Sequence, residues 1–346
     1  MTAPASRLAL YLAGAYTALA VYGSLYPFTG WTDSGAPLTA YLTAGWPRYT
    51  TAFDIATNVA AYVPMGFLWV AALRPGLGRW LAPLSAVVIG MLLSLSLETL
   101  QNFLPSRVPS NLDFGGNVLG TLAGAIAGGF WGATLVDGGR LHDLRHRVFV
   151  AGTMADKGLM LVLLWLLTQF NPETLLFGNG DLRDLLGLDA LAYEVDDFAR
   201  VEAMIVGANT FAVAMLVSLL ARGRLTVPIL LVAGLVAKSF AFELIMNGHD
   251  GLAWATEGSL AGLGAGVGLW LPASLLPHRW RQALATLALL FAAIVVNLAP
   301  ENPYLENTFQ VWNPGEFLNF HGLTRLTSNL WPFLALPWLI LLRGER

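Results

Sequence analysis

The sequence predicts an all-α integral membrane protein, a polytopic bundle of about ten transmembrane helices that contains a parallel internal repeat. The composition is the first reason: 56% of the 346 residues are hydrophobic and only 12% are charged. Soluble domains average about 25% charged residues, so this chain has too few charges to cover a globular surface of its size. The net charge of -3 is small and cysteine is absent, so the composition indicates no nucleic-acid partner, disulfide or thiolate metal site.

Apolar segments of membrane-spanning length are the second reason. A spanning helix needs about 20 mostly apolar residues. Ten segments qualify: 8–27, 54–73, 81–103, 115–136, 150–170, 200–221, 225–247, 252–275, 282–299 and 324–342. The first segment lacks a small-residue cleavage pattern at its end, so we interpret it as a retained anchor rather than a signal peptide.

The arginines give the third reason, because they collect in alternate loops. The basic loops carry Arg7, Arg74, Arg79, Arg140, Arg145, Arg147, Arg222, Arg224, Arg279, Arg281, Arg343 and Arg346. Short cytoplasmic loops hold the Arg and Lys excess in membrane proteins. An error in the number of helices would destroy this alternation, so we predict that both termini lie in the cytoplasm.

A glycine-rich segment occurs twice. Residues 120–128 (GTLAGAIAG) return as 258–266 (GSLAGLGAG), and Leu97–Glu98 upstream returns as Phe242–Glu243. Both copies begin on the same side of the membrane, so the repeat is parallel rather than inverted. We therefore expect a 4+4+2 arrangement: a four-helix unit over 1–148, a degenerate second four-helix unit over 149–278, and two C-terminal helices over 279–346.

Polar residues gather at the ends of the second, third and fourth segments. They are Asp54, Asn58, Glu98, Gln101, Arg107, Asp113 and Asn117. The topology brings them to one end of the bundle, on the extracytoplasmic side. Ionisable residues inside a membrane are costly and usually face a protein interior or a wet cavity, so they mark a candidate site. Arginine can bind phosphate bidentately, and a desolvated carboxylate can act as an acid or base.

This reasoning assigns candidate roles to the seven residues. Glu98 and Asp113 are the candidates for catalysis. Candidate substrate contacts are Asp54, Asn58, Gln101, Arg107 and Asn117. The second copy keeps Glu243 but has Gly251 and Ala255 where the repeat expects Asp113 and Asn117, so we expect it to serve as scaffold.

The same residues carry a resemblance to a known family. The pattern Asp54–(x3)–Asn58–(x5)–Pro64–Met65–Gly66–Phe67, then Glu98–(x2)–Gln101–(x5)–Arg107, then Asp113–(x3)–Asn117–(x2)–Gly120–(x3)–Gly124 resembles the VanZ-like membrane family over about residues 50–130. The resemblance implies a cell-envelope protein of the bacterial cytoplasmic membrane. It supplies no reaction.

Simpler structural roles remain open for several of these side chains. Asp54 and Asp113 could cap helix N-termini. Glu98 could form an ion pair with Arg107. Lys238, near the middle of its segment, could form one with Glu257 or Glu202.

Three functions are compatible with the sequence. The first is an outward-facing polar site that binds or processes an anionic, lipid-linked envelope substrate. The second is a non-enzymatic structural or assembly subunit of a larger membrane complex. The third is a transporter with a relay of Lys238, Glu243 and Glu257. The pattern does not decide whether the protein is an enzyme. We expect no metal and no cofactor, and as partners the lipid bilayer and either a lipid-linked envelope precursor or other membrane subunits.

Overall fold

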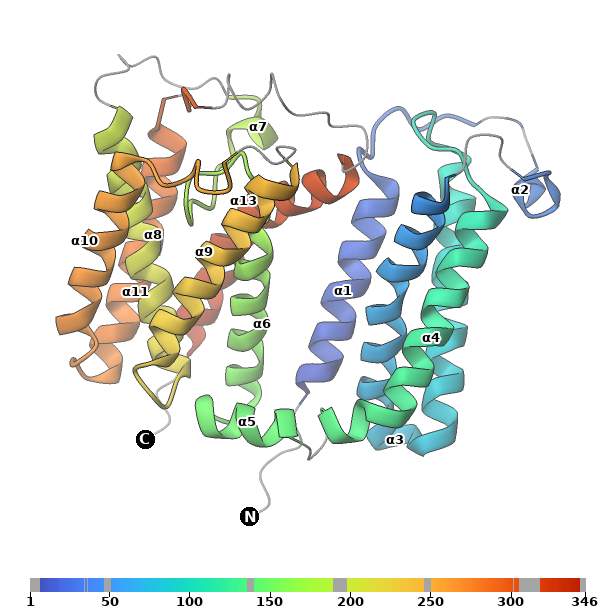
Figure 1. Ribbon diagram of the computed structural model, residues 1–346, viewed down its shortest axis with the longest axis horizontal. Coiled ribbons are helices and arrows are strands. Elements are labelled where there is room, and N and C mark those ends of the chain that lie inside the picture. Colours follow the sequence, from blue (N-terminus) through green and yellow to red (C-terminus); the bar gives the residue numbers. More distant parts are fainter. Residues whose placement is uncertain are drawn as a thin grey trace. The chain divides into compact units, whose positions relative to one another are not determined.

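The computed structural model is helical in the part of the chain that it describes (Figure 1). It describes all residues except 1–6, 34, 36, 47–50, 136–139, 189–197, 246–249, 301, 305–317 and 343–346. Among the described residues the one β-type pairing is an isolated bridge between Phe149 and Ala221. The chain divides into two compact units, unit 1 (Met1–Arg147) and unit 2 (Val148–Arg346).

Unit 1 is built from three long helical elements and short connections. Its helices are α1 (Leu8–Leu25), α2 (Ala40–Thr43), α3 (Ala52–Gln101) and α4 (Asn111–Leu135), followed by α5 (Arg140–Val148), which reaches the boundary with unit 2. The long α3 is two helices joined at Gly78, which has φ 73° and ψ -175°. Glycine tolerates this left-handed φ without steric cost. The chain therefore turns back there, and α3 begins and ends at the same end of the unit (Figure 1).

Glycines of α4 let it lie very close to the first half of α3. A Cβ added to Gly120 or Gly124 would overlap the backbone carbonyl of Val59 or Val63. A Cβ on Gly128 would lie 2.8 Å from the Cβ of Val70. Small residues spaced by four allow such close backbone approach between membrane helices. The glycine run therefore sets the distance between α3 and α4.

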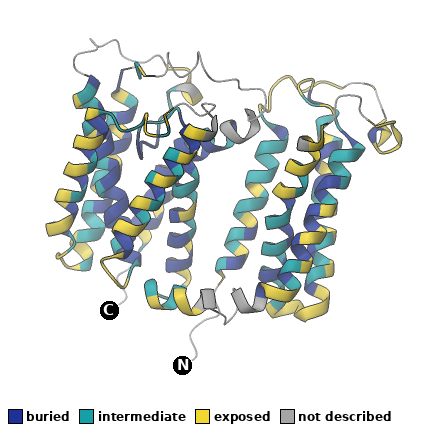
Figure 2. Cartoon of the chain, viewed as in Figure 1, coloured by how far each residue is buried: buried dark blue, intermediate teal, exposed yellow. Residues whose placement is uncertain are grey.

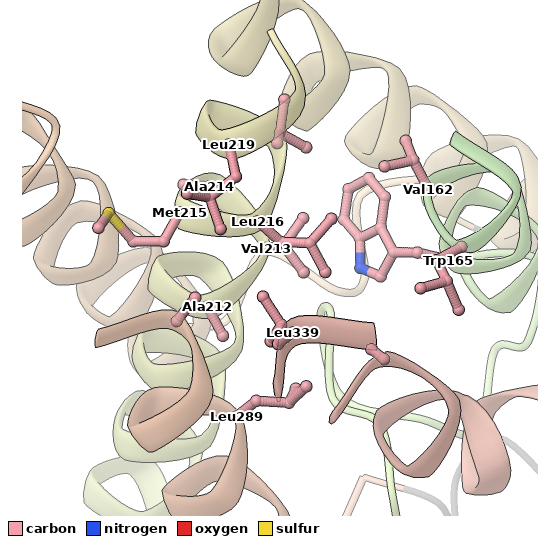
Figure 3. Close-up of a cluster of buried hydrophobic side chains, with 14 of the residues drawn as sticks. Val162, Trp165, Ala212, Val213, Ala214, Met215, Leu216, Leu219, Leu289 and Leu339 are labelled. Atoms are coloured by element: carbon pink, nitrogen blue, oxygen red, sulfur yellow. The ribbon is translucent and has the colours of Figure 1, made fainter. Parts of the chain in front are cut away.

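Unit 2 is a second helical bundle with a large buried core. Its helices are α6 (Thr153–Thr168), α7 (Arg183–Leu186), α8 (Phe198–Leu220), α9 (Thr226–Ile245), α10 (Glu257–Ala273), α11 (His278–Leu298) and α13 (Leu318–Leu341). Figure 3 shows the core around α8, where Leu216 and its neighbours lie between Trp165 of α6 and Leu339 of α13. Burial follows this arrangement, with α8 largely buried and α10 partly exposed (Figure 2).

The second glycine run packs as the first does. A Cβ on Gly262 would lie 2.6 Å from the Ala203 carbonyl oxygen of α8, and one on Gly266 would lie 2.6 Å from the Cβ of Thr210. Both members of the sequence repeat thus form a glycine face against a neighbouring helix of their own unit. The predicted division at residues 278 and 279 stays a prediction.

The predicted membrane segments coincide with helices. Each of the ten segments overlaps one helix or one half of α3. Within the described residues, five helices are long and apolar enough to cross a membrane. The all-α membrane bundle is therefore confirmed, and the count of ten spans stays a prediction. One detail differs from expectation: the basic connection around Arg74 and Arg79 is helical, apart from the break at Gly78.

Candidate functional site

The candidate site lies at one end of unit 1, where α1 and α3 end and α3 and α4 begin (Figure 1). The polar cluster consists of Asn58, Tyr62, Ser94, Glu98, Ser110, Asp113 and Asn117. Ser94, Glu98, Ser110 and Asn117 are buried, and so is Tyr62. Buried polar groups cost free energy unless they are hydrogen-bonded, so the partners of each one decide what the cluster does.

Glu98 is tied to the start of α4. Its carboxylate is 3% exposed, and Oε2 accepts a hydrogen bond from the Ser110 backbone N–H at 2.9 Å. The Ser110 hydroxyl accepts from the backbone N–H groups of Leu112 and Asp113 at 3.1 and 3.4 Å. Ser110 therefore caps α4 and holds the carboxylate beside the positive end of that helix, where a negative charge is stabilised.

Asp113 and Asp54 have different partners. The Asn58 side-chain amide donates to Asp113 Oδ1 at 2.7 Å, and this pair is only partly buried. Exposed Asp54 forms a capping box at the start of α3: its Oδ2 accepts from the Thr51 backbone N–H at 2.8 Å, and its own N–H donates to the Thr51 hydroxyl at 3.2 Å. Capping thus accounts for the Asp54 contacts, whereas at α4 the cap is Ser110 rather than Asp113.

The buried end of the cluster contains a polar atom without a partner. The Asn117 side-chain amide donates to the Ser94 hydroxyl at 3.0 Å, but Asn117 Oδ1 has no hydrogen-bond partner. Tyr62 is also buried, and its hydroxyl has the Ser94 side chain as its hydrogen-bonding neighbour and lies near Glu98. Tyr62 was missed in the sequence analysis, although it follows Asn58 by four residues and so shares its helix face.

Arg107 and Gln101 bind the end of α1. The Arg107 guanidinium donates to the Tyr26 carbonyl oxygen from Nε at 3.0 Å and from Nη2 at 2.6 Å, and to the Gly23 carbonyl oxygen at 3.3 Å. The Gln101 amide donates to the Ser24 carbonyl oxygen at 3.0 Å. Partial burial lowers the pKa of Arg107 below its ordinary value.

The predicted ion pair between Glu98 and Arg107 is wrong. Within the described residues, the Glu98 contact is the Ser110 backbone N–H, and the α1 carbonyls accept from Arg107. The physical reason is that α1 ends beside the α3–α4 connection, and its terminal carbonyls need donors.

Lys238 of unit 2 also binds backbone carbonyls. Its ammonium is fully buried and donates to the carbonyl oxygens of Asn171 and Thr174, both at 2.6 Å, and to the Thr174 hydroxyl at 3.1 Å. All three of its protons are therefore used. The predicted ion pair with Glu257 or Glu202 is wrong, because the turn that follows α6 supplies the acceptors.

The buried carboxylate beside the second glycine run is Glu202, not the repeat-related Glu243. Glu202 is 1% exposed, and its Oε1 accepts from the hydroxyls of Thr256 and Ser259 at 2.6 and 2.8 Å. Glu243 is exposed. In both units a buried carboxylate thus lies at the start of the helix that carries the glycine run, α4 in unit 1 and α10 in unit 2. Glu98 comes from the helix just before that helix in the chain, whereas Glu202 comes from α8, which is not the preceding helix. Within the described residues, no group of three or more His, Asp or Glu side chains is arranged to hold a metal ion.

The apolar helices and the polar cluster at their ends define a multi-pass α-helical membrane protein. Residues 10–131 match the family model described as VanZ/LLP1, so this part of the chain is VanZ-like, and the resemblance predicted from the motif is confirmed. No curated protein and no solved structure matches the chain. The family and the helices together support a bacterial membrane protein.

Proposed function

We propose that unit 1 binds the headgroup of a lipid-linked molecule of the bacterial envelope in its polar cluster. The membrane helices bring the cluster within reach of lipid headgroups at one membrane surface. The alternation of arginine-rich loops supports the outer surface of the cytoplasmic membrane, with both termini in the cytoplasm.

One observation carries the proposal: the polar groups at this end of unit 1 range from exposed to fully buried. Asp54 is exposed, the pair Asn58–Asp113 is partly buried, and Glu98 is buried behind them. The deepest of these groups, Asn117, has a buried side-chain oxygen, Oδ1, without a hydrogen-bond partner. Capping of α3 and α4 requires only the groups at the helix starts. The deeper groups exceed that need, and a polar headgroup would supply a donor to Asn117 Oδ1.

The contacts distinguish binding candidates from positioning candidates. Asn58, Asp113 and Asn117 are the proposed headgroup contacts, and Glu98 is the acid-base candidate if the bound molecule is processed. Arg107 and Gln101 are better suited to positioning, because they hold the end of α1 through the carbonyls of Tyr26 and Ser24. A phosphate contact by Arg107 would have to share the guanidinium with Tyr26.

The test compares the lipids that remain bound during purification. Wild type and the double variant Glu98→Gln, Asp113→Asn are extracted from bacterial membranes in mild detergent, and bound lipids are quantified by mass spectrometry. Ser96→Ala is the matched control, because Ser96 lies on the same helix and its hydroxyl donates to its own helix at the Leu92 carbonyl. We expect wild type and control to retain a lipid that the double variant loses. Equal lipid content in all three proteins would overturn the proposal.

A transporter relay through Lys238, Glu243 and Glu257 is the weaker alternative. The Lys238 protons already bind the turn after α6, and Glu243 is exposed. An assembly subunit is the second alternative: buried Lys238 binds the turn after α6 and buried Glu202 binds the start of α10, as scaffold residues would. Gentle solubilisation that yields only a monomer would count against an assembly role.

A further inference from the structure

We infer that unit 2 binds the phosphate of an acidic phospholipid between the turn from α8 to α9 and the start of α11. Arginines from both segments and the start of a long helix meet there, and apolar side chains are exposed beside them. The site belongs to unit 2, so this inference is independent of the function proposed for the polar cluster of unit 1.

The arginines come from two connections that the fold brings together. Arg222 and Arg224 lie between α8 and α9, and Arg279 and Arg281 lie at the start of α11. Arg281 Nη1 donates to the Ser218 carbonyl oxygen near the end of α8 at 2.8 Å, which fixes the start of α11 beside the α8–α9 turn. Arg281 and Arg224 are close enough to interact electrostatically. Positive charge is therefore concentrated at this place.

Acidic side chains do not neutralise this charge. Within the described residues, none of the four arginines forms an ion pair. The helix α6 begins beside the end of α8, but its first-turn carboxylate, Asp156, is buried. Like charges repel one another at the membrane end of a bundle, and a bound anion would remove this repulsion.

Most of the guanidinium donors are unused as well. A guanidinium has five N–H groups. Arg222 Nε donates to the Phe149 carbonyl oxygen at 3.0 Å, and Arg281 uses Nη1. Among the described residues, exposed Arg224 and Arg279 donate no hydrogen bond. These two side chains are therefore available to a phosphate, which arginine binds in a bidentate manner.

The start of α11 adds to the attraction for an anion. Its N-cap residue is Pro277, and no side-chain hydrogen bond caps the helix. The first turn of this helix contains no acidic residue and instead carries Arg279. Because the N-terminal end of a helix is partially positive, an arginine there is unfavourable and an anion is favourable. A phosphate at this point would interact with both the helix and the arginines.

Exposed apolar side chains favour a lipid over a free phosphate ion. Leu225 follows Arg224, Trp280 follows Arg279, and both apolar side chains are exposed. The Arg279 guanidinium lies 5.8 Å from the centroid of the Trp280 ring. Tryptophan is enriched where headgroups meet hydrocarbon. A phospholipid can place its phosphate among the arginines and its acyl chains against Leu225 and Trp280, and a headgroup ammonium would be repelled.

The test measures binding of radiolabelled phosphatidylglycerol to the full chain in a nonionic detergent. The competitors are unlabelled phosphatidylglycerol, phosphatidylethanolamine with the same acyl chains, and inorganic phosphate. The test variants are Arg224→Gln and Arg279→Gln. Arg79→Gln of unit 1 is the matched control, because Arg79 is also exposed and also lies over the tryptophan that follows it. Thermal unfolding of each variant shows whether it folds normally.

We expect phosphatidylglycerol to compete well and the other two to compete at least tenfold less effectively. Each test variant should bind phosphatidylglycerol about 5-fold more weakly, which corresponds to about 1 kcal/mol per basic residue near a membrane surface. Arg79→Gln should bind as wild type does. Equal competition by phosphatidylethanolamine would show that the site does not select an acidic lipid, and equal competition by inorganic phosphate would assign the site to a free ion. Either result, or an equal loss of binding in Arg79→Gln and Arg279→Gln, would overturn the inference.

Discussion

The Arg107 guanidinium donates two hydrogen bonds to the carbonyl oxygen of Tyr26, at 3.0 and 2.6 Å. Unit 2 contains the same relationship, in which Lys238 donates to the carbonyl oxygen of Asn171 at 2.6 Å. Both carbonyls belong to the residue before a proline that follows the first long helix of the unit. Carbonyls at a helix end lack intrahelical partners, and in each unit a cation from another element supplies the donor.

Substitution of Arg107 should therefore destabilise unit 1. Hydrogen bonds to charged groups contribute about 1.5–3 kcal/mol each, so Arg107→Ala should lower the thermal unfolding temperature in detergent, and Arg107→Lys should lower it less. Arg79→Ala is the control, because Arg79 is exposed and stacks only on neighbouring Trp80. If Arg107→Ala unfolds at the wild-type temperature, the contact with Tyr26 does not stabilise the end of α1.

Lys238→Met should destabilise unit 2. The substitution leaves the carbonyls of Asn171 and Thr174 buried without their donor, and each unsatisfied group costs about 1–3 kcal/mol. Tryptophan fluorescence during heating can measure this loss, because Trp165 packs against Phe177 in the same core. A Lys238→Met protein that is as stable as wild type would show that Lys238 is not required for packing, and a relay role would regain support.

The glycine face of α10 allows a matched comparison within one helix. A Cβ on Gly262 would lie 2.6 Å from the Ala203 carbonyl oxygen, whereas a Cβ on Gly264 would meet nothing within 4 Å. Gly262→Ala should cost about 1–3 kcal/mol through overpacking. Gly264→Ala should be neutral or stabilising by up to about 1 kcal/mol, because alanine favours helix. Equal unfolding temperatures of the two variants would contradict the close packing of α8 and α10.

Asp54 should act through capping rather than through direct headgroup contact. Asp54→Ala should cost about 0.5–2 kcal/mol, the usual effect of losing a cap. Asp54→Glu should keep most of the stability, because glutamate at the third helical position completes a capping box. Lipid retention by Asp54→Glu should equal that of wild type. Stable protein with reduced lipid retention would instead assign Asp54 to the binding site.

The sequence was sufficient to predict the helices and the end of the unit at which the polar groups gather. Apolar length and alternating arginines predict the helices. Asn58 and Asp113 meet because both lie near helix starts at the same end of the unit. The partners could not be predicted as well. Arg107 binds backbone carbonyls, which leave no side-chain pattern in a sequence.

Two buried groups show the limits of periodicity and repeats. Tyr62 looks like an ordinary aromatic of a membrane helix, and only the fold places its hydroxyl beside Ser94. The repeat alignment pointed to Glu243, but the buried carboxylate beside the second glycine run is Glu202 on a different helix. An equivalent place in three dimensions can be filled from either neighbouring helix, and a linear alignment cannot show this.

The most direct test of the account is an experimental structure of the full chain in nanodiscs made from native bacterial lipids. We predict headgroup density within hydrogen-bonding distance of Asn117 Oδ1, reached past the Asn58–Asp113 pair. A structure in which Asn117 Oδ1 has a protein donor and no lipid density enters the cluster would contradict the proposed function.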